Sequence, residues 1–224
     1  MLSMNRVRRA IEKLIAPHAI LSYSSAGEDL VLDFLTDYLP TGFYVDVGCN
    51  HARQHSNTYR FYRKGWSGIA IDANAAFERE FARTRPRDQF IRACVSDKVE
   101  DVKFHHFHHD TLSSVSGAHF YDNDEHYALE RIETMTTRRL DDILAEANCP
   151  ERFDILNVDV EGMDEAVLRS LDLKRFQPRV ILVELNGTDL DVGRLSDSGI
   201  AKSLEKFGYS PVAIHWGNGF FRRA

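Results

Sequence analysis

The stretch Gly42-Phe43-Tyr44-Val45-Asp46-Val47-Gly48-Cys49-Asn50 predicts the fold of the chain around it. Residues 43–47 form a short, largely apolar run, which is the pattern of a buried parallel strand. Asp46 places a carboxylate near the carboxyl end of this strand, and Gly48 follows where the backbone must turn and can approach a ligand closely. A helix is expected to begin near Ser56, a good N-cap residue. Strand, acid, glycine turn and helix together predict a nucleotide-type pocket at the carboxyl end of a strand.

A second acid follows at the expected distance. Residues 68–72 have the pattern of the next strand, which ends on Asp72. An acid about 20 residues beyond the glycine turn is the usual ligand of ribose hydroxyls. The alternative is an ordinary strand–helix–strand unit whose strands happen to end in acids.

The glycine pattern favours one cofactor over another. A dinucleotide fingerprint needs three glycines to hold a pyrophosphate, whereas here only Gly48 is present, with Asn50 and Ala52 at the other places. Asp46 would repel a diphosphate and suits a cationic ligand that carries an amino group. We therefore favour S-adenosylmethionine over a nicotinamide cofactor.

The remaining chain alternates between expected strands and helices. Further strands are expected at residues 89–95, 102–106, 131–134, 153–159 and 180–183, and helices at residues 28–38, 56–64, 75–83, 140–147, 164–171 and 200–207. Residues 212–216 and 220–223 flank Gly217-Asn218-Gly219, whose Asn-Gly step is a strong hairpin signal. The order predicts an α/β domain with a Rossmann-like, doubly wound, mostly parallel sheet and a C-terminal antiparallel hairpin. We expect this domain to span residues 41–224, with residues 1–40 as an N-terminal helical segment packed on it.

Composition limits the possible partners and location. The 224 residues carry a net charge of −6, which argues against a dedicated nucleic-acid binder. Three cysteines without close spacing indicate reduced thiols and a cytoplasmic location. No apolar run approaches the roughly 20 residues that span a bilayer, so no stable membrane insertion is expected. Residues 1–20 have an amphipathic pattern, for which a packing helix is favoured over a membrane-surface helix.

Four blocks resemble the FkbM family of S-adenosylmethionine-dependent methyltransferases. They are Gly27-Glu28-Asp29, Asp46-Val47-Gly48-Cys49-Asn50 with Ser56 and Thr58 after it, Gly65-Trp66-Ser67-Gly68 through Asp72, and Asp159-Val160-Glu161-Gly162. The chain departs from the family pattern at Ser25, where glutamine is common, and at Ala52, where many members have glycine. The resemblance implies a fold of the class I methyltransferase type, and usually O-methylation of a sugar, a glycan or a small metabolite.

The expected cofactor-binding residues lie at strand ends and in the blocks above. They are Glu28, Asp46, Gly48, Asn50, Ser56, Thr58, Asp72, Ala73, Ser96, Asp97 and Asp159.

A base within reach of the acceptor hydroxyl would assist transfer. Asp159 and Glu161 follow the strand at residues 153–159 and are the first candidates, although Asp159 could hold only cofactor or backbone and Glu161 could cap the next helix. His109 represents the histidines at positions 105–109, which could instead form a metal cluster or an exposed polar loop. We expect the irregular stretch at residues 105–123 to cover the acceptor.

No resident metal is expected, although Asp159, Glu184 and Asn186 would offer oxygen ligands to magnesium. Two other classes compete with the methyltransferase. The missing glycines argue against a nicotinamide-dependent oxidoreductase, and the carboxylates at positions 159 and 161 argue against a non-catalytic nucleotide-binding module. The acceptor is expected to be a small molecule or glycan, and the sequence assigns no oligomeric state.

Overall fold

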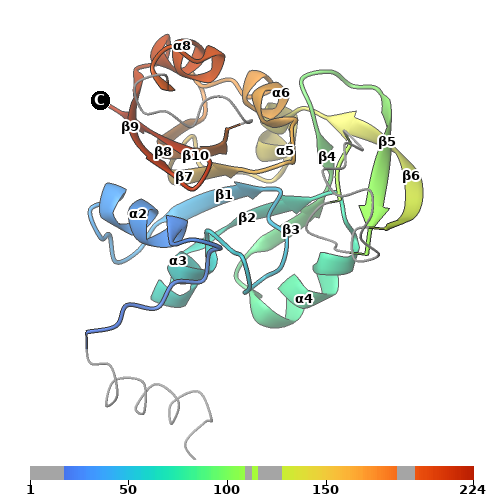
Figure 1. The fold of residues 1–224 in the computed structure, drawn as a ribbon, viewed down its shortest axis with the longest axis horizontal. Coiled ribbons are helices and arrows are strands. Elements are labelled where there is room, and N and C mark those ends of the chain that lie inside the picture. Colours follow the sequence, from blue (N-terminus) through green and yellow to red (C-terminus); the bar gives the residue numbers. More distant parts are fainter. Residues whose placement is uncertain (1–17, 109–112, 116–127, 186–194) are drawn as a thin grey trace, which may run out of the picture.

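The structure is a computed structural model that describes residues 18–108, 113–115, 128–185 and 195–224 (Figure 1). Its strands are β1 Phe43–Val47, β2 Ser67–Asp72, β3 Gln89–Arg92, β4 Cys94–Val95, β5 Asp101–Phe107, β6 Leu129–Arg138, β7 Arg152–Val158, β8 Gln177–Glu184, β9 Tyr209–His215 and β10 Asn218–Arg223. Its helices are α2 Glu28–Leu35, α3 Tyr59–Lys64, α4 Ala76–Thr84, α5 Leu140–Glu146, α6 Asp164–Arg169 and α8 Gly199–Glu205.

A seven-stranded sheet forms the centre of the molecule. Its strand order is β3-β2-β1-β7-β8-β10-β9. Neighbouring strands run parallel from β3 to β8, and β10 is antiparallel to both β8 and β9. The carboxyl ends of β1, β2, β7 and β8 therefore meet at one edge of the sheet, where α/β proteins of this kind bind ligands.

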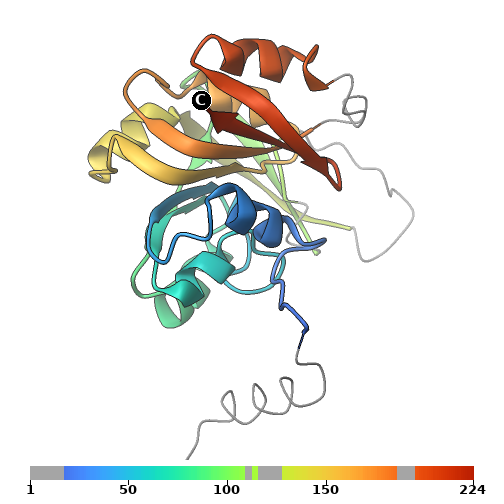
Figure 2. The ribbon, with the colours of Figure 1, turned by 90° about the vertical axis from the view of Figure 1, so that its left-hand side faces the viewer.

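Helices cover both faces of this sheet (Figure 2). In β1, Val45 and Val47 pack in the core cluster that includes α5, α6 and α8, whereas Tyr44 packs with α2 and α3 on the opposite face. The third cluster places α4 on the same side as α3, through Phe77 and Phe81. Both faces are thus apolar and covered, which explains the nearly continuous hydrophobic strands. The predicted doubly wound α/β fold is confirmed.

A second, three-stranded sheet stands beside the first, in the order β4-β6-β5. The sequence predicted one strand over residues 89–95, and this was wrong. The chain changes partner at Ala93, whose N–H donates to the carbonyl oxygen of Asp72 at 3.0 Å, and Cys94 then pairs with Thr137 in the small sheet. The main-sheet part of the predicted strand is therefore only four residues long.

The predicted C-terminal hairpin is confirmed, although its turn is displaced from the Asn-Gly step. Trp216 and Gly217 are the two turn residues, with φ values of 49° and 81°. Positive φ at both central positions is the type I′ pattern that matches the twist of paired strands. Asn218 and Gly219 are already paired with β9 and β8.

The predicted N-terminal segment is described from residue 18 onward. Leu32 and Leu35 of α2 are buried against the main sheet, while residues 1–17 lie outside the described part, so the domain boundary at residue 40 stays a prediction. Among the described helices, none has the length and apolar composition needed to cross a bilayer. All three cysteines are unpaired and buried.

Candidate active site

A pocket of about 280 Å³ opens at the carboxyl edge of β1, β2 and β7. This volume is near the lower end of small-ligand sites, which run from about 300 to 1,000 Å³. The structure brings together there seven of the residues predicted from the sequence, namely Asp46, Gly48, Asn50, Asp72, Ala73, Asp159 and Glu161.

Gly48 makes the close approach between β1 and β7 possible. Its φ is 75°, a conformation that favours glycine. A Cβ atom at this position would lie 1.7 Å from the carbonyl oxygen of Asp159. Because that carbonyl packs directly against the glycine turn, a residue with a side chain does not fit at this position.

Asp72 is held in place by backbone donors at the end of β2. The N–H of Asn50 donates to its Oδ2 at 3.0 Å, and the N–H of Asn74 donates to its Oδ1 at 2.8 Å. Asn50 reaches this position with a φ of 52°, which asparagine tolerates better than most residues. The carboxylate lines the pocket, and carboxylate oxygens can each accept more than one hydrogen bond. Its placement suits two vicinal hydroxyls of a ribose.

The small sheet supplies an apolar wall next to Asp72. Ala73, Cys94 and Phe104 form a buried cluster there, and all three line the pocket together with Val95 and the described segment at residues 113–115. This wall offers a ligand mainly carbon and sulfur atoms, which suits the face of a flat aromatic ring system. Residues 113–115 belong to the stretch at residues 105–123 that was predicted to be irregular and to cover the site. That prediction was wrong for residues 105–107, which continue strand β5 and pair with β6, while residues 109–112 and 116–123 lie outside the described residues.

Asp46 lies in the floor of the pocket and is 1% exposed. Thr58 Oγ1 donates to its Oδ2, and Asn157 Nδ2 donates to its Oδ1 at 2.8 Å. Burial raises the pKa of Asp46, while Arg85, Thr58 and Asn157 act in the opposite direction. Asn157, on β7, also accepts a hydrogen bond from Asn57 Nδ2 at 3.1 Å.

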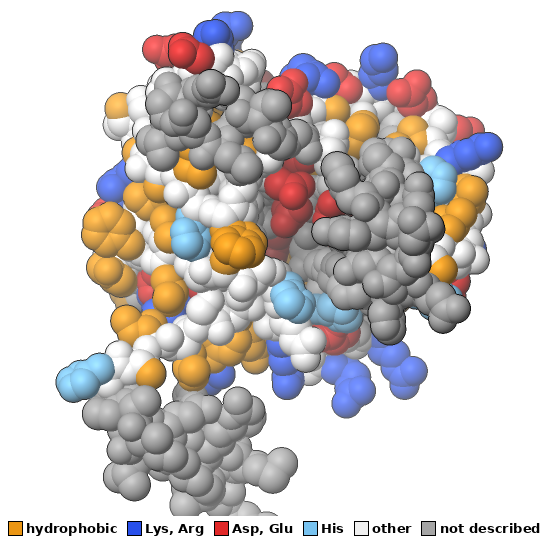
Figure 3. All heavy atoms as spheres, in the orientation of Figure 1, with side chains coloured by type: hydrophobic (Ala, Val, Ile, Leu, Met, Phe, Trp, Pro, Cys, Tyr) orange, Lys and Arg blue, Asp and Glu red, His pale blue; other side chains and the backbone are white. Residues whose placement is uncertain are grey.

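Four carboxylates gather beyond β7 and β8, and Figure 3 shows acidic side chains in a hollow near the centre of that face. Burial, Glu184 and Asp164 raise the pKa of Asp159 well above its ordinary value. Burial and the charges of Glu161 and Asp164 raise the pKa of Glu184 to about 7. Burial and Asp164 also raise the pKa of Glu161. All three groups therefore hold a proton more tightly than isolated carboxylates do, and Glu184 exchanges its proton near neutral pH.

Asp164 fixes the backbone that carries two of these acids. Its Oδ1 accepts from the N–H of Val160 and its Oδ2 from the N–H of Gly162, both at 3.2 Å. Glu161, between them, has a φ of 52°, an uncommon value for a residue other than glycine. Burial raises the pKa of Asp164 to about 6, against the effect of these donors. A carboxylate-braced loop thus aims Glu161 at the pocket.

Five of the predicted cofactor-binding residues do not line the pocket. Ser56 and Thr58 are buried at the start of α3 behind it, and Glu28 accepts from the N–H of Ala26 at 2.9 Å. Ser96 is buried, and Asp97 pairs with Arg169 at 2.8 Å, which lowers the pKa of Asp97. His109 and Asn186 lie outside the described residues.

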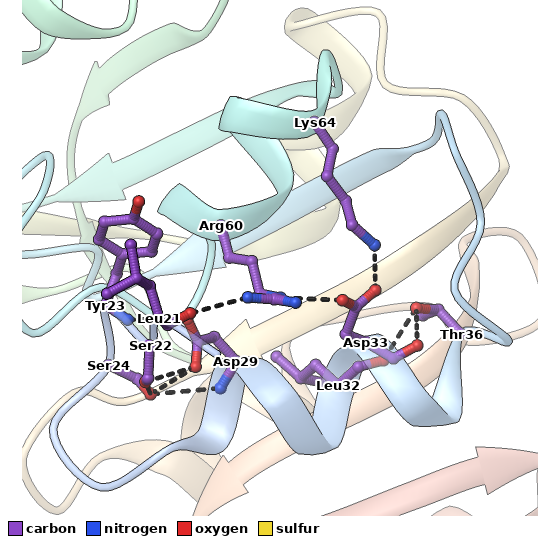
Figure 4. A network of polar contacts seen from close by, with 10 residues as sticks. All are labelled: Leu21, Ser22, Tyr23, Ser24, Asp29, Leu32, Asp33, Thr36, Arg60 and Lys64. Carbon is purple, nitrogen blue, oxygen red and sulfur yellow. Dashed lines mark hydrogen bonds and ion pairs between the residues drawn. The ribbon is translucent and has the colours of Figure 1, made fainter. Parts of the chain in front are cut away.

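The Gly-Glu-Asp block acts through the loop before it (Figure 4). Asp29 is fully buried and accepts from Ser22 Oγ at 2.6 Å, from the N–H of Tyr23 at 2.8 Å and from Ser24 Oγ at 3.1 Å. These bonds hold the segment that carries Ser25, which lines the pocket and lies 3.1 Å from His55 Nδ1 through its Oγ. The block therefore builds a wall of the site.

Sequence reasoning missed Asn57, Asn157 and Arg85. Asn157 has a recognisable signal, because it is a polar residue inside an otherwise apolar strand. Arg85 precedes a proline and has only the pattern of a helix end. Within the described residues, no three His, Cys, Asp or Glu side chains are placed to hold a metal ion.

Fold and pocket together define an α/β protein with a nucleotide-type site of the class I methyltransferase kind. A family model described as "Methyltransferase FkbM domain" matches residues 46–211, and the chain belongs to this family of S-adenosylmethionine-dependent methyltransferases. No curated protein matches the chain.

The solved structures that are similar to it include two methyltransferases. A TehB-like SAM-dependent methyltransferase from Corynebacterium glutamicum has 12% identity and a TM-score of 0.42, over 98% of this chain and 97% of that one. A SAM-dependent methyltransferase from Thiobacillus denitrificans, in complex with S-adenosyl-L-homocysteine, has 13% identity and a TM-score of 0.36, over 92% of this chain and 72% of that one.

Proposed function

We propose that the chain transfers a methyl group from S-adenosylmethionine to a hydroxyl oxygen of a sugar, a glycan or another small metabolite. One observation carries this proposal. The same pocket has a fixed carboxylate beside an apolar wall at one end and a group of carboxylates with raised pKa values at the other.

The residues present fit the methyl donor. Asp72 suits the ribose hydroxyls, and the wall of Ala73, Cys94 and Phe104 suits the adenine ring. Asp46 in the floor suits the ammonium group of the amino-acid part. When bound, S-adenosylmethionine supplies an electrophilic methyl group on a good leaving group. The chain's own contribution is to align the acceptor with it, which is chiefly a matter of positioning.

Asp159 or Glu161 would accept the proton of the acceptor hydroxyl. A general base is most effective when its pKa lies near the working pH, and both groups have raised pKa values. Both line the pocket.

The test has two arms. Calorimetry with S-adenosylmethionine, S-adenosylhomocysteine and NAD should give binding of the first two and none of NAD. Incubating the protein with methyl-labelled cofactor and cell glycans or metabolites, followed by mass spectrometry, should then place the label on oxygen. Label on nitrogen or carbon would refute the hydroxyl assignment while leaving the cofactor assignment intact.

A further inference from the structure

We propose that Arg85 is a positioning residue of the cofactor site. Acting through the hydroxyl of Thr58, it keeps Asp46 in the carboxylate form that faces the ammonium group of the methyl donor. The inference rests on the proposed function, in which that ammonium group lies over Asp46.

Arg85 has a single fixed position outside the pocket. It is 0% exposed, although it sits at the end of α4 where arginine is usually solvated. Its Nε donates to Asp88 Oδ2 at 2.6 Å and its Nη2 to Thr58 Oγ1 at 2.9 Å. Its guanidinium carbon lies 5.3 Å from the ring centre of Tyr44 and 4.8 Å from that of Phe81. Such packing leaves the planar cation one orientation.

The direction of the hydrogen bonds determines the ionisation state of Asp46. Arginine can only donate, so the oxygen of Thr58 must accept from Arg85. A hydroxyl has one proton, and that of Thr58 is therefore directed to Asp46 Oδ2. Asn157 donates to the other oxygen of Asp46 at 2.8 Å. Both oxygens receive donors, which fits a carboxylate and disfavours a carboxylic acid.

Within the group of Asp46, Arg85 and Asp88, one negative charge is left for a ligand. Arg85 is one buried cation between the buried carboxylates of two acids, Asp46 and Asp88. Asp88 is satisfied away from the pocket, because Tyr44 OH donates to it at 2.8 Å and the N–H of Gly68 donates at 3.0 Å. Asp46 is the acid of this group that lines the pocket. The uncompensated charge is thus presented to the ligand, and a cationic group there completes the neutralisation.

The decisive experiment removes the side-chain hydroxyl of Thr58, which connects Arg85 to Asp46. Thr58→Val keeps the shape and removes the hydroxyl, so in the empty pocket Asp46 takes up a proton that must leave when the ammonium group binds. Isothermal titration calorimetry at pH 7, in two buffers of different ionisation enthalpy, measures the number of protons released when the ligand binds. We expect S-adenosylmethionine to bind the variant about 10- to 100-fold more weakly, with extra proton release and with affinity recovering as the pH rises.

Matched ligands and variants separate this role from general packing. 5′-Methylthioadenosine, which lacks the amino-acid part, should bind Thr58→Val as it binds wild type. Thr58→Ser keeps the hydroxyl, so its affinity for S-adenosylmethionine and the number of protons released on binding should equal those of wild type. Thr36→Val, which removes another fully buried threonine hydroxyl from the end of α2, should change neither.

Two outcomes overturn the inference, namely an unchanged proton count in Thr58→Val or an equal loss of affinity for 5′-methylthioadenosine. If Thr58→Val does not fold, Arg85→Met combined with Asp88→Asn removes the buried pair without leaving an unpaired charge, and the same signature is expected. Failure of wild type to bind S-adenosylmethionine at all would instead refute the proposed function, and this inference with it.

Discussion

The carboxylates at the two ends of the pocket have different surroundings, namely hydrogen-bond donors at one end and other acids at the other. At the ends of β1 and β2, Asp46 and Asp72 each receive two hydrogen-bond donors. At the end of β7, Asp159 and Glu161 line the pocket, and burial together with the charges of neighbouring acids raises their pKa values. The first pair is fixed for binding, whereas the surroundings of the second pair make its carboxylates more basic than isolated ones.

This difference indicates that burial alone does not assign a role to an acid. Asp46 is deeply buried, yet its donors keep it ready to be a counter-ion. Asp159 lies close by across Gly48 and is surrounded by like charges. Substitutions at the two ends should therefore affect different steps.

The largest expected effect is at the β7 end. Glu161→Gln and Asp159→Asn keep the side-chain shape and remove the base, so at least one of them should lower kcat by about 10²–10⁴-fold. Affinity for S-adenosylmethionine, measured by calorimetry, should stay near wild type. Glu165→Gln, at an exposed position on α6, is the control. Normal turnover in both variants would point to the histidine-containing stretch at residues 105–109 as the source of the base.

A second substitution tests how closely the two ends must approach. In Gly48→Ala the new methyl group would clash with the carbonyl oxygen of Asp159, and the alanine would have to keep the positive φ of the glycine. The combined effect should lower the free energy of unfolding by about 3 kcal/mol or more and remove cofactor binding. Gly162→Ala, at a φ of 97° with no atom within 4 Å of the new Cβ, should lower it by only about 1 kcal/mol. Equal melting temperatures for the two variants would contradict this.

The donor-rich end is tested at Asp72. Asp72→Ala should weaken binding of S-adenosylmethionine by about 1.5–3 kcal/mol, roughly ten- to hundredfold, because the ribose loses its carboxylate partner. Calorimetry on the folded variant measures this. Asp172→Ala, which removes a carboxylate that accepts from the N–H of Lys174 in an exposed turn, should leave affinity unchanged. An unaltered dissociation constant in Asp72→Ala would remove Asp72 from the ribose site.

The smallest effect concerns Glu184 and pH. Its pKa in the folded protein is about 7, against an ordinary value of 4.5. The folded state therefore binds this proton more tightly than the unfolded chain, and the resulting stability is present below pH 4.5 and lost as the pH rises through 7. Relative to wild type, Glu184→Gln should be more stable at pH 8 than at pH 4.5, by at most about 3 kcal/mol, because each pKa unit corresponds to about 1.4 kcal/mol. Thermal unfolding at both pH values measures this, and the exposed Glu205→Gln should give no such difference.

Much of the fold was predictable because local patterns and long-range packing agree in it. The runs at residues 43–47 and 68–72 are apolar and end on acids, and they form neighbouring parallel strands. The change of partner at Ala93 was not predictable, since one alternating run continues through it and the choice between two sheets depends on where β6 lies. The turn at Trp216-Gly217 was missed for a related reason, because cross-strand register prevailed over the stronger Asn-Gly signal.

The site was predictable where a residue's type and its place at a strand end coincide, as for Asp46, Asp72 and Asp159. It was not predictable where a residue acts through another. Thr58 was expected at the cofactor and lies behind Asp46 instead, and Arg85 carries no sign in the sequence that it is buried. Side chains from residues 46, 58 and 85 meet only after β1, α3 and α4 have packed.

The position of β10 has a consequence for how the chain is synthesised and folded. This strand comes after all the others in sequence, yet it lies inside the sheet between β8 and β9 and buries Phe220 and Phe221. In the sheet, β9 forms hydrogen bonds with β10 alone. Until residues 218–223 have left the ribosome, β8 therefore presents an open strand edge, which is a template for pairing with other chains. A nascent or truncated chain that lacks these residues should be a substrate for chaperones, even though the whole cofactor pocket has already been translated.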